Sequence, residues 1–328
     1  MDKQHFFVGI DVSKKELVVA VDGRKTTTFK NTKRGVASLL KFAEKFADDL
    51  APWFVMESSG VYSSVPAIRL VEMHNALVSI INPGRVKAHA RAIGFRSKTD
   101  SQDAQVILDY AKKTKLHVWK PAPLALRILR QYIDQIRACK KIIVMTENRM
   151  AAHEFEGAEK GIINSDRATI RHFERQIAKL ETDIKALVTD DEQLDKQDSL
   201  LKTIPGIALD SACKIIAYTR SEITKRSAKQ LTAFAGLAPA HRQSGTSLHG
   251  QSRIDKQGCA PLRVTLYMCA LSAATHNPEL SPLYERLITR KDRPLAKKQA
   301  QVAVMRKLLL IARAVLISGK PFDRNYQT

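Results

Sequence analysis

Hydrophobic positions follow two different periods along the first 121 residues. Spacings of three and four mark residues 33–47 and 61–71 and predict two amphipathic helices. We expect Pro66 in the first turn of the second helix, where a proline is tolerated. Strands that alternate with such helices predict an α/β layer. The runs with the length and composition of strands are residues 6–12, 16–21, 26–29, 53–58 and 76–81.

The pattern becomes wholly helical after Pro121. Apolar residues recur at spacings of three and four over residues 126–150 and again over 170–187. Two such segments, joined by a turn around residues 157–165, predict an antiparallel coiled-coil hairpin. Residues 302–315 predict a last helix that belongs to a core. The expected domains are an α/β domain at 1–121, the helical hairpin at 122–200 and a mainly α-helical domain at 201–328.

Four carboxylates occupy positions where charge is costly or crowded. Asp11 is set inside an apolar strand and Glu57 ends another, and a buried carboxylate is unfavourable unless it is paired or liganded. Asp100 and Asp103, three residues apart, share one face of a predicted first helical turn. The plain alternative is that the helix dipole favours acids there. Four converging carboxylates suit two Mg²⁺ ions that activate a nucleophile in phosphoryl transfer.

A polar, glycine-rich segment follows Pro239 and predicts a surface loop. Its hydroxyl groups belong to Ser244, Thr246 and Ser247, and Arg242 stands beside them as a candidate phosphate ligand. A serine hydroxyl is a weak nucleophile until it is deprotonated or polarised by a metal. The acid site would supply what the serine lacks if the two domains meet. The alternative is a flexible loop that only contacts DNA.

The chain carries a net charge of +21, which implies a polyanionic partner. Residues 84–150 hold 15 Lys or Arg against 5 Asp or Glu, and residues 241–328 hold the same numbers. Basic side chains in such strips bind nucleic-acid phosphates, and the alternative is a solvated helix face. The candidate contacts are Arg85, Lys87, Arg91, Arg96, Lys98, Arg242, Arg253, Lys256, Arg290, Lys291, Arg293, Lys297 and Lys298.

Residues 152–200 have the opposite balance, with 12 acids and 7 Lys or Arg. Nucleic acid should avoid this stretch, which favours contacts between proteins. We expect the helical hairpin to join copies of the chain into a dimer or tetramer, although it could serve only as a spacer.

Several classes of protein are disfavoured by the sequence. No apolar run reaches the roughly 18 residues of a transmembrane helix, and the first strand starts too early for a signal peptide to precede it. The four cysteines show no Cys-x-x-Cys spacing and predict free thiols rather than zinc ligands. We therefore expect a cytoplasmic protein.

Several motifs together resemble a known family. Gly9–Lys14 (GIDVSK), Met56–Tyr62 (MESSGVY) and Lys98–Ala104 (KTDSQDA) resemble the RuvC-like domain of DEDD transposases, the insertion-sequence recombinases of the family numbered one hundred and ten. The likeness continues in Thr203–Ile207 (TIPGI) and Phe234–Gly245 (FAGLAPAHRQSG). It therefore covers nearly the whole chain, with the motifs in the family's order.

The resemblance implies an RNase H-like fold for the first domain and an enzyme that recombines the DNA of an insertion sequence. It implies metal binding by Asp11, Glu57, Asp100 and Asp103. It also implies that Ser244, in the family's Ser-Gly step, attacks a DNA phosphate and forms a covalent intermediate. A guide RNA encoded by the element would specify both DNA partners.

The segment Thr203–Ile207 also resembles a helix-hairpin-helix turn, whose backbone N–H groups bind a phosphate. Ala208 stands in place of the second glycine of that pattern. A purely structural helix start is therefore the alternative.

Two other functions fit the same residues. One is a Mg²⁺-dependent nuclease of the Holliday-junction type, in which water is the nucleophile and Ser244 only contacts DNA. The other is a nucleic-acid-binding adaptor without catalysis, whose acids are structural. A sugar-kinase fold is disfavoured because no phosphate-binding glycine loop follows the first strand.

Overall fold

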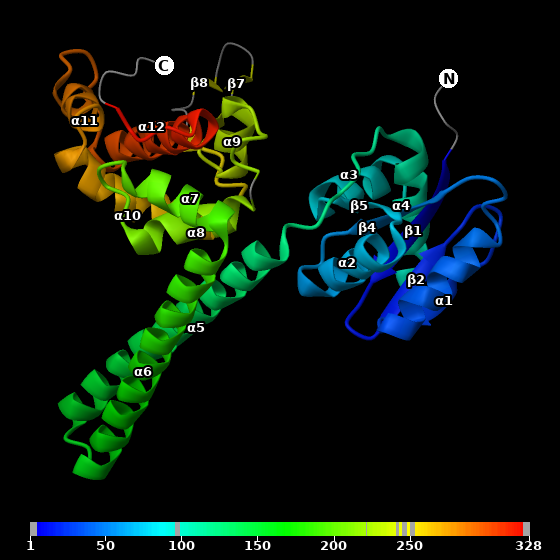
Figure 1. Ribbon diagram of the computed structural model, residues 1–328, viewed down its shortest axis with the longest axis horizontal. Coiled ribbons are helices and arrows are strands. Elements are labelled where there is room, and N and C mark those ends of the chain that lie inside the picture. The colour runs from blue at the N-terminus through cyan, green and yellow to red at the C-terminus, as the bar shows by residue number, and fades with distance from the viewer. Residues whose placement is uncertain are drawn as a thin grey trace. The chain divides into compact units, whose positions relative to one another are not determined.

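A computed structural model describes residues 5–95, 99–220, 222–240, 243–244, 248–249 and 253–323 (Figure 1). The chain divides into two compact units, Met1–Pro121 and Ala122–Thr328. The first is built on a central sheet, and the second is mostly helical. None of the helices within the described residues is long and apolar enough to cross a membrane.

A mixed five-stranded sheet forms the centre of the first unit, with strand order β3-β2-β1-β4-β5. β1 pairs antiparallel with β2 and parallel with β4, while β3 extends the antiparallel side and β5 the parallel side. All five strands expected from the apolar runs are present. β1 has its expected bounds, and the ends of the other strands differ by at most one residue, as strand boundaries commonly do. The strands are β1 Phe6–Val12, β2 Glu16–Ala20, β3 Thr27–Lys30, β4 Pro52–Glu57 and β5 Leu77–Ile81.

Helices cover both faces of this sheet (Figure 1). On one face, α1 and α2 bury Leu39 and Leu70 against Ile10 and Phe54. On the other face, α3 and α4 pack in a second apolar cluster around Val55. This layered α/β arrangement agrees with the RNase H-like fold expected for the unit. The helices are α1 Lys33–Glu44, α2 Val61–His74, α3 Pro83–Ala92 and α4 Asp100–Lys113.

The expectation that Pro66 lies in the first turn of its helix is wrong, because α2 begins at Val61 and Pro66 lies inside it. A proline has no N–H, so Pro66 cannot donate to the carbonyl of Tyr62 four residues earlier. The structure supplies another donor. The side-chain Nδ2 of Asn31 lies 3.2 Å from the Tyr62 oxygen and 3.0 Å from the Ser13 carbonyl oxygen. A side chain from another element thus replaces the missing helical hydrogen bond.

Two long helices, α5 Leu124–Glu156 and α6 Lys160–Asp190, form an antiparallel hairpin in the second unit (Figure 1). α5 continues past its expected end at Met150, and α6 begins earlier than the expected turn allowed. The shorter turn is possible because Gly157 ends α5 with a φ of +72°, in the left-handed region that glycine favours. Coiled-coil packing within this hairpin stays a prediction.

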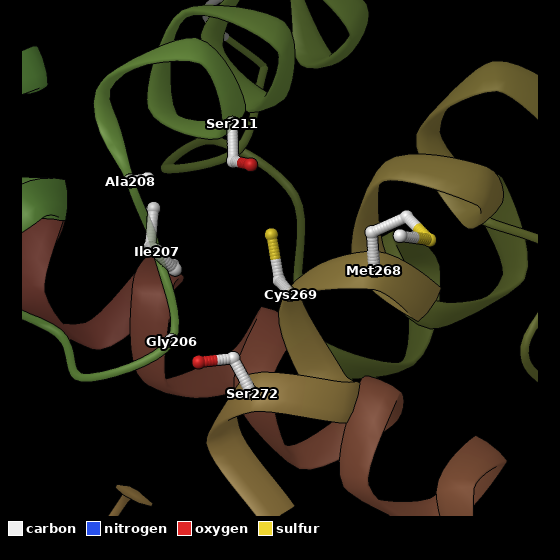
Figure 2. Close-up of a pocket in the computed structure, with 7 residues that line it drawn as sticks. All are labelled: Gly206, Ile207, Ala208, Ser211, Met268, Cys269 and Ser272. Atoms are coloured by element: carbon white, nitrogen blue, oxygen red, sulfur yellow. The ribbon is translucent and has the colours of Figure 1, made fainter.

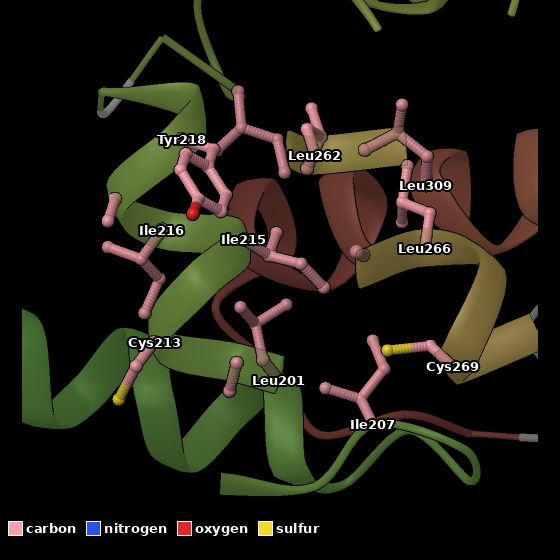
Figure 3. Packing of buried hydrophobic residues seen from close by; sticks show 14 of the residues in the cluster. Leu201, Ile207, Cys213, Ile215, Ile216, Tyr218, Leu262, Leu266, Cys269 and Leu309 are labelled. Atoms are coloured by element: carbon pink, nitrogen blue, oxygen red, sulfur yellow. The ribbon is translucent and has the colours of Figure 1, made fainter. Parts of the chain in front are cut away.

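The remaining helices gather around one apolar core together with the adjoining end of the hairpin. Figure 3 shows Leu201, Ile215, Leu266 and Leu309 converging there from four helices. The last helix buries Val304, Leu308 and Leu309, so its expected place in a core is confirmed. These helices are α7 Glu192–Lys202, α8 Leu209–Thr219, α9 Ala228–Phe234, α10 Ala260–His276, α11 Leu280–Thr289 and α12 Lys297–Ser318.

Candidate active site

The first helical turn of α4 is brought to the sheet by a glycine on β1. Gly9 and Asp11 are two residues apart and therefore project toward the same face of the sheet. A Cβ added to Gly9 would lie 2.5 Å from the Ala104 carbonyl oxygen and 2.6 Å from the Leu108 nitrogen. Only glycine lets α4 approach β1 so closely. The same approach brings the acids at the start of α4 toward Asp11.

Two polar contacts fix the start of α4. Thr99 caps the helix, and its side chain accepts a hydrogen bond from the Gln102 N–H. The hydroxyls of Thr26 and Ser101 lie 2.8 Å apart and join the first turn to the residues before β3. The orientation of Asp100 and Asp103 is therefore set by contacts on both sides of the acid pair.

Asp11 and Glu57 stand at the same level of two neighbouring parallel strands. Ile10 is paired with Met56 in the ladder between β1 and β4, and each acid is the next residue in its strand. Both strands run in the same direction, so the two carboxylates follow the same edge of the sheet.

The electrostatics of Asp11 show that the four acids share one region. Its pKa is raised to about 6, first by burial and then by the charges of Asp103 and Asp100. Glu57 adds a smaller effect in the same direction, and a hydrogen bond from the Val12 backbone opposes these effects. Each nearby negative charge disfavours ionisation of Asp11. The region around Asp11 therefore concentrates negative charge.

The acids are not arranged as a ready-made metal cage. Within the described parts of the chain, no three His, Cys, Asp or Glu side chains lie close enough to ligate one ion. The donors present are nonetheless all carboxylate oxygens, the ligands that Mg²⁺ prefers. Burial, and then the charges of the other acids, raise the pKa of Asp11, and a bound cation would offset that repulsion. This donor set fits a divalent cation, which would draw the side chains together.

Ser244 lies on a short strand rather than in the loop that the sequence predicts. β7 Gln243–Ser244 pairs antiparallel with β8 Leu248–His249, with Ser244 opposite Leu248. β6 Pro239–Ala240 pairs in the same way with β9 Arg253–Ile254. We call residues 239–254 the serine ribbon. Such short polar strands carry no periodic apolar signal, so the sequence could not reveal them.

Several candidates lie outside the described residues. They are the hydroxyl residues Thr246 and Ser247 and the basic residues Arg242, Arg96 and Lys98.

The base of the serine ribbon is held by main-chain hydrogen bonds. The Cys259 N–H donates to the Phe234 oxygen at 2.9 Å, and the Asp255 N–H to the Ala238 oxygen at 3.0 Å. Gly258 is needed here, because a Cβ at that position would lie 2.4 Å from the Phe234 oxygen. The Phe-Ala-Gly-Leu-Ala-Pro motif that the sequence singled out is therefore an anchor for the ribbon.

The Arg263 guanidinium completes this anchor. Its Nη1 donates to the Ala235 carbonyl oxygen at 3.0 Å. Gly236, with a φ of +67°, leaves room for it, since a Cβ there would lie 2.4 Å from Nη1. Sequence reasoning did not identify Arg263, Gly236 or Gly258 as ribbon anchors. The only signal was the spacing of two glycines on either side of the polar segment.

The described basic candidates of the first unit lie on α3. Arg85, Lys87 and Arg91 are exposed, while Val86 points into the core. His89 fastens the helix to α4, because its Nε2 lies 2.8 Å from Asp109 Oδ2. The helix with these exposed basic residues, α3, is thereby attached to α4, which carries Asp100 and Asp103.

The basic candidates of the second unit are also exposed. Lys256 lies just after the serine ribbon. The others follow the end of α11 or begin α12, and they are Arg290, Lys291, Arg293, Lys297 and Lys298. Arg253 is described by its backbone only.

Close packing against α10 explains why the turn between α7 and α8 contains a glycine. Gly206 has a φ of +103°, and a Cβ there would lie 2.6 Å from the Ala273 Cβ on α10. α8 begins at Leu209, and its N-cap residue Ala208 supplies no side-chain cap. Figure 2 shows the pocket beside this turn, lined by Gly206, Ile207, Ala208, Ser211, Met268, Cys269 and Ser272. The lining contains no charged side chain, so a phosphate bound here would depend on backbone N–H groups alone, and both interpretations of this motif stay predictions.

Comparisons with known proteins match both units. A family model for transposases of the DEDD type matches residues 8–153, and the model "Transposase IS116/IS110/IS902 family" matches residues 198–285. Two "pilin gene-inverting" proteins, from Moraxella bovis and Moraxella lacunata, are each 30% identical over 323 residues, which cover 97% of this chain and 98% of each relative. An uncharacterized 43.6 kDa protein of insertion element IS110 from Streptomyces coelicolor is 23% identical over 162 residues, 49% of this chain and 38% of the relative.

These matches define a DNA transposase, an enzyme of DNA recombination whose partners are DNA. The chain belongs to the IS110 family of insertion-sequence transposases. Its DEDD-type domain indicates the use of a divalent metal.

Proposed function

We propose that this transposase cuts and rejoins DNA through a covalent serine–DNA intermediate. The Ser244 hydroxyl attacks a phosphodiester phosphorus, and the bond from that phosphorus to one strand breaks. The departing strand takes up the serine proton and leaves with a hydroxyl end. Rejoining is the same reaction in reverse with a different strand, so the phosphodiester bond is conserved and no external energy source is needed.

Asp11, Glu57, Asp100 and Asp103 would hold two Mg²⁺ ions for this reaction. The observation that carries the assignment is the raised pKa of Asp11, to which the three other acids all contribute. When bound at these four acids, Mg²⁺ would polarise the attacking hydroxyl and stabilise charge on the leaving oxygen. The chain itself supplies oxygen ligands on two adjacent strand ends and one capped helix start.

The names of the relatives support rejoining over simple cleavage. The two Moraxella proteins are named for inverting a pilin gene. An inverted segment must be cut at its ends and joined again, which a hydrolytic nuclease does not do. We carry this property to the present chain because the match spans both proteins almost from end to end.

Each part of the chain has a role in this proposal. Residues 1–121 hold the metals, and residues 201–328 carry the serine. The hairpin at 122–200 packs as a coiled coil and joins copies of the chain into a dimer or tetramer. The exposed basic residues of both units bind DNA and a guide RNA encoded by the element.

Trapping of the protein–DNA adduct tests the proposal. The purified protein is incubated with Mg²⁺, RNA transcribed from the element and radiolabelled DNA carrying the element with its flanks, and is then denatured and resolved by size. We expect labelled protein with the wild type and with Ser247→Ala, and none with Ser244→Ala or Asp11→Asn.

Each alternative gives a different result. Nicked DNA without labelled protein would identify a nuclease that uses water. Intact DNA under all conditions, with binding retained, would identify an adaptor. An adduct that disappears with Ser247→Ala but persists with Ser244→Ala would keep the mechanism and change the residue.

A further inference from the structure

An arginine ends α8 in an unusual backbone conformation. Arg220 has a φ of +52°, in the left-handed region that few residues other than glycine adopt. Such a conformation costs a residue other than glycine free energy, and here it caps the end of α8, where the Arg220 N–H donates to the Ile216 carbonyl oxygen. Here it turns the chain sharply out of α8 into the segment that leads to α9.

Two further arginines from other segments are stacked on aromatic rings around this turn. The Arg130 Cζ, on α5, lies 4.3 Å from the centroid of the Tyr218 ring, which Figure 3 shows at the end of α8. The Arg226 Cζ, just before α9, lies 4.7 Å from the centroid of the Phe234 ring. Stacking holds both guanidinium groups in place. We call Arg130, Arg220 and Arg226 the arginine cluster.

The positive charges of the three arginines in the cluster repel one another. The pKa of Arg220 is lowered, first by burial and then by the charge of Arg130, with Arg226 acting in the same direction. Asp134 opposes these effects, but that carboxylate also lies 2.7 Å from the Arg130 Nε and 3.4 Å from an Arg137 nitrogen. The negative charge of Asp134 is therefore shared among several guanidinium groups.

Arg226 has spare capacity to donate hydrogen bonds. Its nearest acid, Glu222, lies 4.0 Å away, at the limit of an ion pair. The Arg226 Nε is buried and has no hydrogen-bond partner within the described residues. A buried donor without a partner is costly, and like charges brought together repel. A bound anion would offset the repulsion between the guanidinium groups and accept hydrogen bonds from their exposed nitrogens.

The cluster lies beside the base of the serine ribbon. Phe234, under the Arg226 guanidinium, accepts the hydrogen bond from Cys259 that anchors the ribbon. Cys259 also contributes to the electrostatics of Arg220. An anion bound here would lie next to the segment that carries Ser244.

We propose that the arginine cluster binds a backbone phosphate of the nucleic acid that the serine ribbon engages. Guanidinium groups bind phosphate oxygens through paired, directed hydrogen bonds. DNA is the partner of this transposase, so a phosphodiester is the anion at hand. The site consists of residues other than the four acids and the basic candidates Arg290, Lys291, Arg293, Lys297 and Lys298, and it positions the strand without reading its sequence.

Binding measured in EDTA tests the site without any cleavage chemistry. A fluorescent 30-base-pair DNA duplex, and in a second arm a single-stranded RNA of the same length, are titrated with the protein at several salt concentrations. Arg220→Gln and Arg226→Gln are compared with Arg171→Gln on α6, an exposed arginine of the acidic hairpin. Because metal is absent, failure of the serine mechanism would leave this result unchanged.

Each cluster variant should reduce the slope of log affinity against log salt by about 0.9 with the duplex, or about 0.7 with the RNA, and Arg171→Gln should not. At 0.1 M salt this corresponds to a loss of affinity of about eightfold for the duplex. A change with either nucleic acid supports the site, and the arm that changes identifies the strand. Slopes equal to that of Arg171→Gln in both arms would overturn it.

A second variant separates loss of charge from loss of folding. Asn adopts the left-handed conformation more readily than most residues, so Arg220→Asn should keep the turn while removing the guanidinium. It should fold, as judged by its melting temperature, and should lose salt dependence as Arg220→Gln does. Wild-type salt dependence in a folded Arg220→Asn protein would overturn the proposal.

Discussion

Gly9 and Ala104 lie so close together that a Cβ on Gly9 would come within 2.5 Å of the Ala104 carbonyl oxygen. Gly9→Ala should therefore push α4 away from β1, at a cost of about 1–3 kcal/mol in unfolding free energy. It should also weaken Mg²⁺ binding, because the acids at the start of α4 would move. Thermal melting and calorimetric Mg²⁺ titration measure both effects. Gly161→Ala on α6 is the control, since nothing lies within 4 Å of its added Cβ. Unchanged Mg²⁺ affinity in Gly9→Ala would contradict this account.

Replacing an acid by its amide should abolish cutting without abolishing DNA binding. We expect Asp11→Asn, Glu57→Gln, Asp100→Asn and Asp103→Asn each to reduce adduct formation by about a hundredfold or more, because bound metal is worth several kcal/mol to the transition state. Asp22→Asn is the matched control. Asp22 is an exposed acid of the same unit whose carboxylate lies 2.6 Å from the Lys112 Nζ. Near wild-type adduct formation by any of the four variants would remove that residue from the site.

The raised pKa of Asp11 should make the stability of the metal-free first unit depend on pH. The folded carboxyl titrates near 6 against an ordinary value of 3.8, so the folded state binds more protons between these values. The contribution of this group to the unfolding free energy therefore decreases as pH rises from about 4 to about 6. Asp11→Asn should flatten the dependence measured by calorimetry.

Mg²⁺ should relieve the same repulsion, because it binds the ionised carboxylates. We expect it to raise the melting temperature at pH 8 and to have little effect at pH 5. The shift at pH 8 should be lost in Asp11→Asn. An equal shift at both pH values would show that Mg²⁺ acts elsewhere.

Asn31 and Pro66 should be energetically coupled through the Tyr62 carbonyl. Asn31→Ala removes both hydrogen bonds of its Nδ2 and should cost about 1–2 kcal/mol. Pro66→Ala restores the helical N–H, so the double variant should lose less than the two single variants together. Asn82→Ala, which removes the cap of α3, is the control and should show no coupling to Pro66→Ala. Additive denaturation energies for Asn31 and Pro66 would refute the substitution of one hydrogen bond by the other.

The active site should be completed between two chains. The proposed nucleophile and the acids belong to different compact units, with the helical hairpin at the start of the second. We expect a Ser244→Ala chain mixed with an Asp11→Asn chain, each inactive alone, to recover recombination. The control is a tagged pull-down that shows mixed oligomers. If a mixture that contains such oligomers shows no recombination, the serine and the acids of one active site come from the same chain.

The sheet and its acids are readable from the sequence for a simple reason. Strands buried on both faces become apolar runs, and a carboxylate inside such a run, as at Asp11, is conspicuous. The pairing of Ile10 with Met56 then follows from the ordinary arrangement of parallel strands. What the sequence did not reveal was the role of Gly9, because the need for a missing Cβ appears only when α4 is in place.

The features that sequence analysis missed depend on contacts between distant segments. Arg130, Arg220 and Arg226 come from different parts of the chain, and no spacing connects the first to the other two. The serine ribbon consists of paired strands of two residues each, too short and too polar to show a period. Asn31 compensates for Pro66 from a separate element, which no local rule for prolines can include.

The hydrogen bonds at the base of the serine ribbon join backbone atoms, apart from the one donated by Arg263. Main-chain contacts are indifferent to the side chains beyond them. The pairing of Pro239–Ala240 with Arg253–Ile254 is likewise a main-chain contact. Substitutions between Ala240 and Arg253 should therefore leave this base intact, whereas any exchange of the whole segment would also have to keep Ser244, the proposed nucleophile.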